Sequence, residues 1–372
     1  MTSPRKLRVL VTTDAVGGVW VYSVELAHAL APLGVEVLLA VMGPPPSEAQ
    51  RRDAGAIRLI DTGLPLDWGD TSAAELARAG GTLAAIASRE AVDVVQTCSA
   101  AVLADAEFEQ PTIAVQHSCL ASWWAAVRGT PMPADFEWRT DLVSRGLQRA
   151  DTVVAPSATF AAETARIYGL ETVATVHNGR LFAAAADGAE RDFVLTASRL
   201  WDEGKNVATL DAAAAQLDVP FQAAGADRRP NGASIRLENL ESGGQLDSGL
   251  LRTLLAQRPV FASAALYEPF GLSVLEAAQA GCALVLSDIP THRELWGEAA
   301  LYVAARDADG FAAAIRRVLG DRSLRAELGD AARQRAERYT PGHMAAAMAW
   351  IYADSLARTA HRALPLQLAG AA

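Results

Sequence analysis

The order of short apolar stretches and longer helical stretches is the feature that most constrains this chain. Residues 7–12 are rich in strand-forming side chains, residues 21–33 carry apolar side chains at helical spacing, and residues 35–41 are again strand-like. Gly34 separates the helical stretch from the second strand. A strand, a helix and a strand in this order form a βαβ unit, which builds a parallel sheet. The chain is therefore predicted to be an α/β protein.

The same alternation runs along the chain with one break. Residues 183–191 (AAAADGAER) are small and polar without a core pattern, so we expect a linker at 184–191. It would join two doubly wound, Rossmann-like domains, residues 1–183 and 192–341, around a central cleft. Residues 342–372 follow as a helical tail. Further strands are expected at 92–97, 112–116, 152–155, 193–198, 221–224, 259–263 and 283–287, further helices at 73–89, 138–149 and 158–168, and helix breaks near Gly320, Gly329 and Pro341.

Charge and composition exclude several classes of protein. The 372 residues carry a formal net charge of −10, which disfavours nucleic acid as a partner and gives no general attraction to anionic lipid. The three cysteines, Cys98, Cys119 and Cys282, lack metal-ligand spacing and are expected to be reduced. We find no predominantly apolar window of about 18 residues and no signal-peptide pattern. A cytoplasmic protein is expected, able to rest on the inner face of a membrane; the oligomeric state is left open.

In doubly wound sheets, ligands bind at the carboxyl ends of the strands. Gly17 and Gly18 lie at such a point, where glycine lets backbone N–H groups approach a phosphate, or serves only the geometry of the turn. The uncharged stretch 110–127 is expected to be a strand followed by a loop. His117 follows the strand at 112–116 and can hydrogen-bond a ligand, act as acid or base, or be a structural loop residue. NAD is not expected, because GxGxxG is absent and residues 41–43 offer no acidic side chain for a ribose.

The second domain offers two cations at its first strand. Arg199 closes that strand and Lys205 precedes the next helix, a pattern that suits a pyrophosphate. Alternatively, both cations pair with Asp202 and Glu203 on a solvated loop.

Residues 267–281 (YEPFGLSVLEAAQAG) carry the most specific pattern. Glu268 follows a strand, a tight loop comes next, and a helix starting near Leu272 carries Glu276. The two carboxylates can thus contact different parts of one extended ligand. As alternatives, Ser273 and Glu276 fit a capping box, and Glu268 could be an exposed loop acid.

These residues resemble the retaining glycosyltransferases of the GT-B fold, glycosyltransferase family 4 (glycosyl transferases group 1). Glu268 and Glu276 are similar to that family's pair of glutamates, and the stretch 287–302 with Glu294 also matches. Arg199 and Lys205 resemble its phosphate-binding pair. Gly17-Gly18 resembles its first loop, and His117 its N-domain histidine. The resemblance covers nearly the whole chain, although the stretch 130–138 matches nothing in the family.

The resemblance implies a role for each matched residue. Glu276 would hold the ribose, and Glu268 would contact the donor sugar and sense its developing charge. Arg199 and Lys205 would stabilise the departing diphosphate, and His117 would hydrogen-bond the transferred sugar. Gly17 and Gly18, together with the backbone N–H groups of Phe270, Gly271, Leu272 and Ser273, would line the sugar and phosphates.

The resemblance further implies transfer from a nucleotide-diphosphate sugar to a glycan, lipid-linked or small-molecule acceptor, with retention. The acceptor would lie on the N-terminal domain, where Trp123, Trp124 and Trp138 either stack on it or only pack, and Arg128 could meet an anionic group. The tail helix would cross back onto that domain. No cofactor or metal is expected, since Asp307-Ala308-Asp309 is better explained as a helix cap. Alternatives are an epimerase or phosphorylase of the same fold and a non-catalytic nucleotide-sugar-binding protein.

Overall fold

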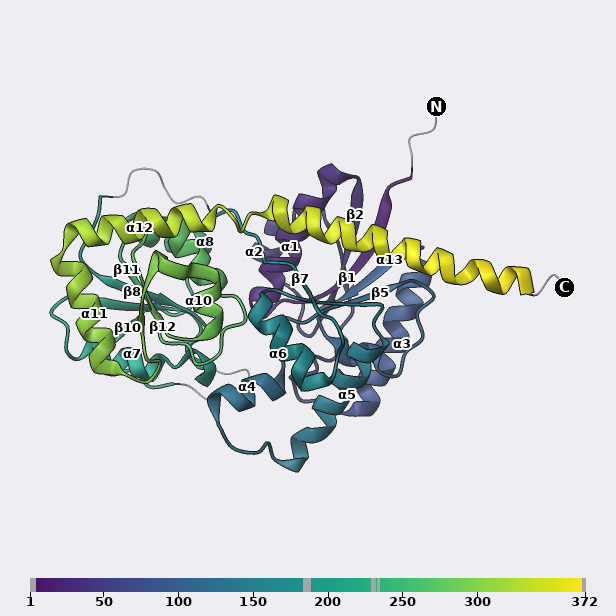
Figure 1. Ribbon diagram of the computed structural model, residues 1–372, viewed down its shortest axis with the longest axis horizontal. Helices are drawn as coiled ribbons and strands as arrows, with labels where there is room; N and C mark the ends of the chain where they lie inside the picture. Colours follow the sequence, from purple (N-terminus) through teal and green to yellow (C-terminus); the bar gives the residue numbers. More distant parts are fainter. Residues whose placement is uncertain (1–4, 183–188, 229–231, 233–234, 370–372) are drawn as a thin grey trace. The chain divides into compact units, whose positions relative to one another are not determined.

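The computed structural model describes residues 5–182, 189–228, 232 and 235–369. The chain forms two compact units, each with its own parallel sheet (Figure 1). Unit 1 runs to Ala125 and includes Thr130–Gly179 and the segment from Pro341, whereas unit 2 comprises Ala126–Gly129 and Arg180–Thr340. The predicted linker at 184–191 lies largely outside the described residues.

Unit 1 contains a seven-stranded parallel sheet in the order β3-β2-β1-β4-β5-β6-β7. Side chains alternate across this sheet, so that Val9 and Val11 of β1 pack in one core and Leu10 in another. Its strands are β1 (Leu7–Asp14), β2 (Val35–Met42), β3 (Arg58–Asp61), β4 (Val94–Thr97), β5 (Thr112–Val115), β6 (Thr152–Ala155) and β7 (Ala174–Thr175).

Helices cover both faces of the unit 1 sheet (Figure 1). The core around Val9 and Val11 includes α1 and the buried Met344, Met348 and Tyr352 of α13, and the core around Leu10 includes α3. No helix in the described part of the chain is both long and apolar enough to cross a membrane. The helices are α1 (Gly18–Leu30), α2 (Glu48–Ala54), α3 (Ala73–Arg89), α5 (Glu137–Arg149), α6 (Ala158–Tyr168) and α13 (Pro341–Ala369), with 3-10 turns η1 (Ala31–Leu33), η2 (Ala100–Leu103) and η3 (Ala134–Phe136).

Unit 2 repeats this plan with a six-stranded parallel sheet in the order β10-β9-β8-β11-β12-β13. In both units the first strand is central and the chain winds outward from it in both directions, which is the doubly wound topology. The predicted α/β fold with two Rossmann-like domains is therefore confirmed. The strands are β8 (Val194–Ala197), β9 (Phe221–Ala224), β10 (Glu241–Ser242), β11 (Val260–Ser263), β12 (Leu284–Ser287) and β13 (Ala300–Val303), and the helices are η4 (Glu203–Lys205), α7 (Val207–Ala214), α8 (Ser248–Ala256), α9 (Leu272–Gln279), α10 (Pro290–Trp296), η5 (Gly297–Ala299), α11 (Ala308–Gly320) and α12 (Arg322–Ala336).

Two local predictions are wrong. The stretch after His117 was expected to be a loop, but it forms the helix α4 (Leu120–Val127). Gly329 was expected to break the helical tail, but it lies inside α12. A Cβ atom at Gly329 would lie 2.4 Å from the carbonyl oxygen of Gly281, so glycine serves close packing of the helix there. Glycine in a helix can thus mark contact with a neighbouring backbone instead of a helix end.

Arg325 connects α12 to the residues just before β8 and β11 of the unit 2 sheet. Its side chain is only 3% exposed. Nη1 donates to Asp192 Oδ1 at 2.7 Å, and Nη2 donates to the carbonyl oxygens of Arg191 and Arg258 at 2.7 and 2.8 Å. Asp192 lies just before β8, and Arg258 lies just before β11. One guanidinium group therefore connects α12 with the starts of both strands.

Two adjacent glycines of α3 should respond oppositely to alanine. A Cβ atom at Gly80 would lie 2.2 Å from the carbonyl oxygen of Val102, whereas a Cβ at Gly81 would meet nothing within 4 Å. Gly80→Ala should lower the free energy of unfolding of unit 1 by about 1–3 kcal/mol through overpacking. Gly81→Ala should raise it by about 0.5–1 kcal/mol, because alanine loses less conformational entropy in a helix. Denaturant unfolding of both variants checks this, and shifts of the same sign would contradict it.

Candidate functional site

The carboxyl edge of the unit 2 sheet holds the predicted donor-side residues. β8 and β11 are neighbours, and the chain winds away from them in opposite directions. This is the topological switch point, where doubly wound sheets bind ligands. Arg199 and Lys205 follow β8, and Glu268 follows β11.

Lys205 and Glu268 form a nearly buried ion pair at this edge. Nζ of Lys205 lies 2.6 Å from Oε2 of Glu268, and the two side chains are 16% and 11% exposed. Glu268 is thus not the exposed loop acid of the alternative interpretation. Lys205 does not pair with Asp202 or Glu203 in the described contacts either. The fold therefore holds together two opposite charges that lie 63 positions apart in the sequence.

Backbone hydrogen bonds hold the two loops of this pair in register. The N–H groups of Leu266 and Tyr267 donate to the carbonyl oxygen of Gly204 at 2.8 and 3.2 Å. Asn206 adopts a left-handed conformation with φ 51°, and its Nδ2 donates to the carbonyl oxygens of Ala264 and Ala305. The polar groups next to Lys205 are thus used to fix the backbone, which places the ammonium group opposite the carboxylate.

Arg199 has a different partner. Its Nη2 lies 2.8 Å from Oδ2 of Asp202, which agrees with the alternative interpretation for this one cation. The guanidinium group also lies over the ring of Trp201, 5.5 Å from its centroid. The Arg199 side chain is 45% exposed, so most of its remaining donors face solvent. The structure thus assigns the two predicted phosphate-binding cations to separate carboxylates.

The helix α9 begins beside Glu268 without a side-chain cap. Gly271 is its N-cap with φ 90°, a conformation that favours glycine, and a Cβ atom there would lie 3.3 Å from Cγ of Glu268. Ser273 is the second residue of α9 and not its N-cap, so the capping box of Ser273 and Glu276 does not form. The backbone N–H groups at the start of a helix favour anions when they are uncapped. The loop Phe270–Ser273 therefore offers donors next to the ion pair.

Glu276 instead pairs with a residue that the sequence analysis missed. It is 5% exposed, and its Oε1 lies 2.9 Å from Nε of Arg180. Arg180 follows β7 at the start of the unit 2 segment, 96 positions earlier in the chain. Spacing within 267–281 could not reveal this partner, because Arg180 lies outside that stretch and meets Glu276 only through the fold of unit 2.

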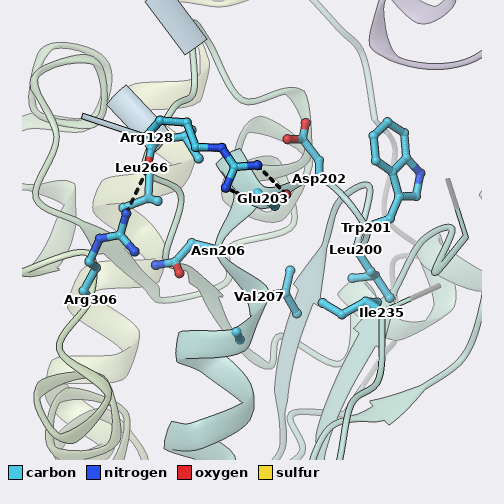
Figure 2. A pocket seen from close by; sticks show the side chains of 12 residues that line it. Arg128, Leu200, Trp201, Asp202, Glu203, Asn206, Val207, Ile235, Leu266 and Arg306 are labelled. Atoms are coloured by element: carbon cyan, nitrogen blue, oxygen red, sulfur yellow. Dashed lines mark hydrogen bonds and ion pairs between the residues drawn. The ribbon is translucent and has the colours of Figure 1, made fainter. Parts of the chain in front are cut away.

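The segment that contains Lys205 also lines a pocket of about 400 Å³ in unit 2 (Figure 2). Arg128, which was predicted to meet an anionic acceptor, pairs here with Glu203 at 2.8 Å. Arg306 donates to the carbonyl oxygen of Val127 at 3.1 Å. Figure 2 shows these two arginines on one side of the pocket and Leu200 and Ile235 on the other. The pocket thus combines an apolar wall with two guanidinium groups.

Unit 1 holds the remaining predicted site residues. Gly17 is the N-cap of α1 and Gly18 its first residue, and no side chain caps this helix. His117 follows β5, and its ring stands edge-on to Tyr22 of α1 with centroids 4.3 Å apart. Nε2 of His117 is buried and has no hydrogen-bond partner among the residues that the structure describes. Burial lowers the pKa of His117 to about 4.

His117 should therefore stay neutral through the physiological range. A histidine whose folded pKa lies below its unfolded value adds stability above the unfolded value and loses it as the pH falls toward the folded one. For His117 this loss falls between about pH 6.5 and about pH 4. An NMR titration of the imidazole protons, assigned with His117→Gln, measures the pKa directly. Titration of His117 near pH 6.5 would contradict the prediction.

A further polar cluster at the carboxyl edge of unit 1 was missed. Ser99 follows β4, and its Oγ donates to Oδ2 of Asp67 at 2.8 Å. Arg139 donates to the carbonyl oxygens of Asp67 and Gly69. Burial raises the pKa of Asp67, and the nearby charge of Asp14 adds to the effect. The preceding strand, β3, is short and partly exposed, so no strong strand pattern indicated that Asp67 lies near the carboxyl edge of the sheet.

The three tryptophans proposed for the acceptor side all make local ring contacts. Trp123 and Trp124 lie in α4 with centroids 6.2 Å apart, and Trp124 lies 5.7 Å from Phe136. The guanidinium group of Arg139 lies 4.5 Å from the ring centroid of Trp138. These contacts show packing for each ring, and acceptor stacking stays a prediction.

The Asp307–Asp309 pattern bears on both metal binding and helix capping. Within the described ranges, no group of three or more His, Cys, Asp or Glu side chains could hold a metal ion. Asp307 is the N-cap of α11, and its side chain accepts from the N–H of Gly310. The interpretation of the Asp307–Asp309 pattern as a helix cap is confirmed.

Known proteins match this chain in sequence and in fold. Residues 16–180 match the family profile described as Glycosyltransferase Family 4, and residues 234–335 match Glycosyl transferases group 1. A glycogen synthase of Mycobacterium tuberculosis is 43% identical over 94 residues, which cover 25% of this chain and 23% of that protein. The match therefore spans about a quarter of this curated relative.

Two solved structures share the fold over almost the whole chain. Sucrose-phosphate synthase from Thermosynechococcus elongatus gives a TM-score of 0.79 at 21% identity and covers 95% of this chain and 100% of that chain. HepE from Anabaena, solved in complex with UDP-glucose, gives 0.70 at 17% identity and covers 94% of this chain and 100% of that chain. At these identities the likeness concerns the fold.

Proposed function

Since this chain belongs to the glycosyltransferases of the GT-B fold, we propose that it transfers a hexose-type sugar from a nucleotide-diphosphate sugar to a glycan, lipid-linked or small-molecule acceptor. The reaction is retaining and needs no metal. One observation carries this proposal: Lys205 and Glu268 are paired at the switch point of unit 2, beside the uncapped start of α9. A cation, an anion and the backbone N–H groups of a helix start together suit a diphosphate joined to a sugar.

The chemistry of the bond that breaks explains these residue types. Cleavage of the anomeric carbon–oxygen bond leaves positive charge on the sugar and negative charge on the diphosphate. Lys205 and the N–H groups of Phe270–Ser273 stabilise the departing diphosphate, and Arg199 adds a second cation after it turns from Asp202. Glu268 contacts the sugar, where its charge favours the developing cation. Fixed charges of this kind act without reorganisation during the reaction.

Ligand binding then changes the partner of Lys205. The ammonium group of Lys205 pairs with Glu268 in the structure. A diphosphate competes for that ammonium group and leaves the carboxylate available to the sugar. The acceptor hydroxyl attacks the anomeric carbon from the side of the leaving group, which takes the acceptor proton, so no enzyme nucleophile is needed. Glu276, which Arg180 keeps charged and in place, holds the ribose.

Unit 1 takes part in the proposed reaction, and the thiols of the chain bear on where the protein resides. Gly17, Gly18 and the neutral His117 contribute to the sugar and phosphate side, and the tryptophans near α4 receive the acceptor. HepE binds UDP-glucose in its solved complex, which makes UDP-hexoses the first donors to test, followed by GDP- and ADP-sugars. Cys98, Cys119 and Cys282 form no disulfide in the structure, which fits a reducing, cytoplasmic compartment. Peripheral contact with the inner face of the membrane is part of the same proposal.

A thermal-shift screen tests donor binding. UDP-glucose, GDP-mannose and ADP-glucose are added separately, each with and without EDTA. One of them should stabilise the protein by about 3 kcal/mol when present at a hundred times its dissociation constant. The shift should survive the chelator. No shift with any of the three would contradict the donor assignment, and a shift abolished by EDTA would contradict metal independence.

A turnover assay separates the proposed transferase from its alternatives. Release of nucleoside diphosphate is followed with the donor alone and with a panel of mono-, oligo- and lipid-linked saccharides. A transferase releases nucleotide faster with one acceptor and forms a larger saccharide. Donor binding without turnover on any acceptor would favour a non-catalytic nucleotide-sugar-binding protein, and a changed sugar with donor alone would favour an epimerase.

A further inference from the structure

His292 lies deep in unit 2, behind the Lys205–Glu268 pair. It belongs to α10, and its ring is 0% exposed. The charges of Glu268 and Lys205 both act on its pKa, the first raising and the second lowering it. Burial outweighs both and lowers the pKa below the usual range. The ring is therefore a neutral imidazole next to two charged groups.

The hydrogen bonds of His292 define which ring nitrogen carries the proton. Nδ1 lies 3.0 Å from the carbonyl oxygen of Ser287, which can only accept. It also lies 3.1 Å from Oγ of Ser287, whose own proton is donated to the carbonyl oxygen of Ala265 at 2.6 Å. Both contacts require a proton on Nδ1. Nε2 is then a buried acceptor, and it has no hydrogen-bond partner among the described residues.

This chain of contacts leads to the loop of Glu268. Ala265 stands three residues before Glu268, in the loop between β11 and α9, and the N–H of Leu266 is bonded to Gly204 in the loop of Lys205. Ser287 ends β12, the neighbour of β11 in the sheet. We propose that His292, in its Nδ1–H form, is a positioning residue that fixes the Ala265–Glu268 loop through Ser287. It thereby holds the Glu268 carboxylate where it contacts the donor sugar.

The proposal rests on the proposed function, because it assigns the sugar contact to Glu268. It makes a prediction about binding that needs no acceptor. A nucleoside diphosphate alone does not contact the Glu268 carboxylate, whereas the sugar of a nucleotide sugar does. Loss of His292 should therefore reduce the extra affinity that the sugar provides and leave the affinity for the nucleoside diphosphate unchanged.

Three substitutions distinguish the roles of the two ring nitrogens of His292. The amide nitrogen of His292→Asn can replace the Nδ1 donor to Ser287, whereas that of His292→Gln lies at the Nε2 position and cannot. His292→Phe keeps the ring volume without either nitrogen. His292→Asn should keep the sugar-dependent gain in affinity within about threefold, and His292→Gln and His292→Phe should each lose about tenfold of it, the scale of one hydrogen bond to a charged or fixed polar group.

Calorimetric titrations use the pairs UDP and UDP-glucose, GDP and GDP-mannose, and ADP and ADP-glucose, and continue with the pair that the wild type binds. Ser287→Ala should match His292→Phe, and the double variant should lose no more than either, because both break one chain of contacts. If His292→Phe fails to fold, Ser287→Ala and His292→Gln provide the same comparison. Equal losses for nucleotide and nucleotide sugar, or an Asn variant as impaired as the Phe variant, would overturn the positioning role.

The outcomes for the two proposals differ. A wild-type protein that binds none of the six nucleotides overturns the proposed function and, with it, the role of His292. A wild type that binds a nucleotide sugar better than its nucleotide, with His292→Phe and Ser287→Ala unchanged in that difference, overturns the role of His292 alone.

Discussion

Replacing Glu268 by glutamine should lower kcat by about 100-fold or more while donor affinity changes by less than about threefold, the size expected when one fixed electrostatic contact to the transition state is removed. Glutamine keeps the shape of the side chain but removes the charge that favours the sugar cation. It also ends the ion pair with Lys205, whose Nζ lies 2.6 Å away. Lys205 then remains available to the diphosphate, and the glutamine amide can still hydrogen-bond the sugar, which is why donor binding should survive.

Steady-state release of nucleotide and a direct titration of the donor measure the two quantities. Glu298→Gln is a matched control, because it removes the same charge from an exposed side chain of unit 2. The control should keep wild-type kcat. A Glu268→Gln variant that loses kcat and donor affinity in equal proportion, or that behaves like the control, would contradict the assignment.

Glu276→Ala should lower donor affinity more than it lowers kcat, which is the opposite of the effect expected for Glu268→Gln. The ribose lies away from the bond that breaks, so its contacts act equally in the ground state and the transition state. Removing this 5% exposed carboxylate also leaves Arg180 without its partner, so the folded fraction has to be measured in the same samples. Equal effects on both parameters in the Glu268 and Glu276 variants would refute the division of roles.

Replacing Arg325 by methionine should be the most damaging change for the stability of unit 2. Methionine keeps the apolar volume but leaves the carbonyl oxygens of Arg191 and Arg258 without a donor that now lies 2.7 and 2.8 Å away. The loss should be about 3 kcal/mol, because breaking a buried charged group's hydrogen bonds leaves polar partners unsatisfied. For a unit of this size the unfolding midpoint should fall by roughly 10 °C.

Arg322→Met provides the control, since Arg322 lies in the same helix and is exposed. Thermal unfolding followed by circular dichroism should show a small change for Arg322→Met and a large one for Arg325→Met. Equal midpoints for the two variants would mean that the contacts of Arg325 contribute nothing net to stability.

Much of the fold followed from local signals in the sequence. Strands β6 and β9 and helices α3 and α6 were placed at their observed bounds, because turns or helix caps flank each apolar pattern. Strand β3 was missed because its side chains are partly exposed, and α4 was interpreted as a loop because an apolar run without charges shows no helical period.

The contacts of the site could not be predicted from spacing. The ion pairs Lys205–Glu268 and Arg180–Glu276 join residues 63 and 96 positions apart, and they form only after the strands have assembled. The sequence placed each of the donor-side residues at a strand end, but it offered two partners for Arg199 and a cap for Glu276. Arg199 pairs with the nearby Asp202, whereas the partner of Glu276 depends on how distant segments pack.

The position of α13 affects the order in which the protein can mature during translation. Met344, Met348 and Tyr352 are 1%, 0% and 0% exposed in the core of unit 1, although they are made after all of unit 2. Domains generally fold as they leave the ribosome, the N-terminal one first. Here the nascent N-terminal unit has to wait for the last helix, and a truncated chain that ends before Pro341 would display uncovered apolar surface to chaperones and proteases.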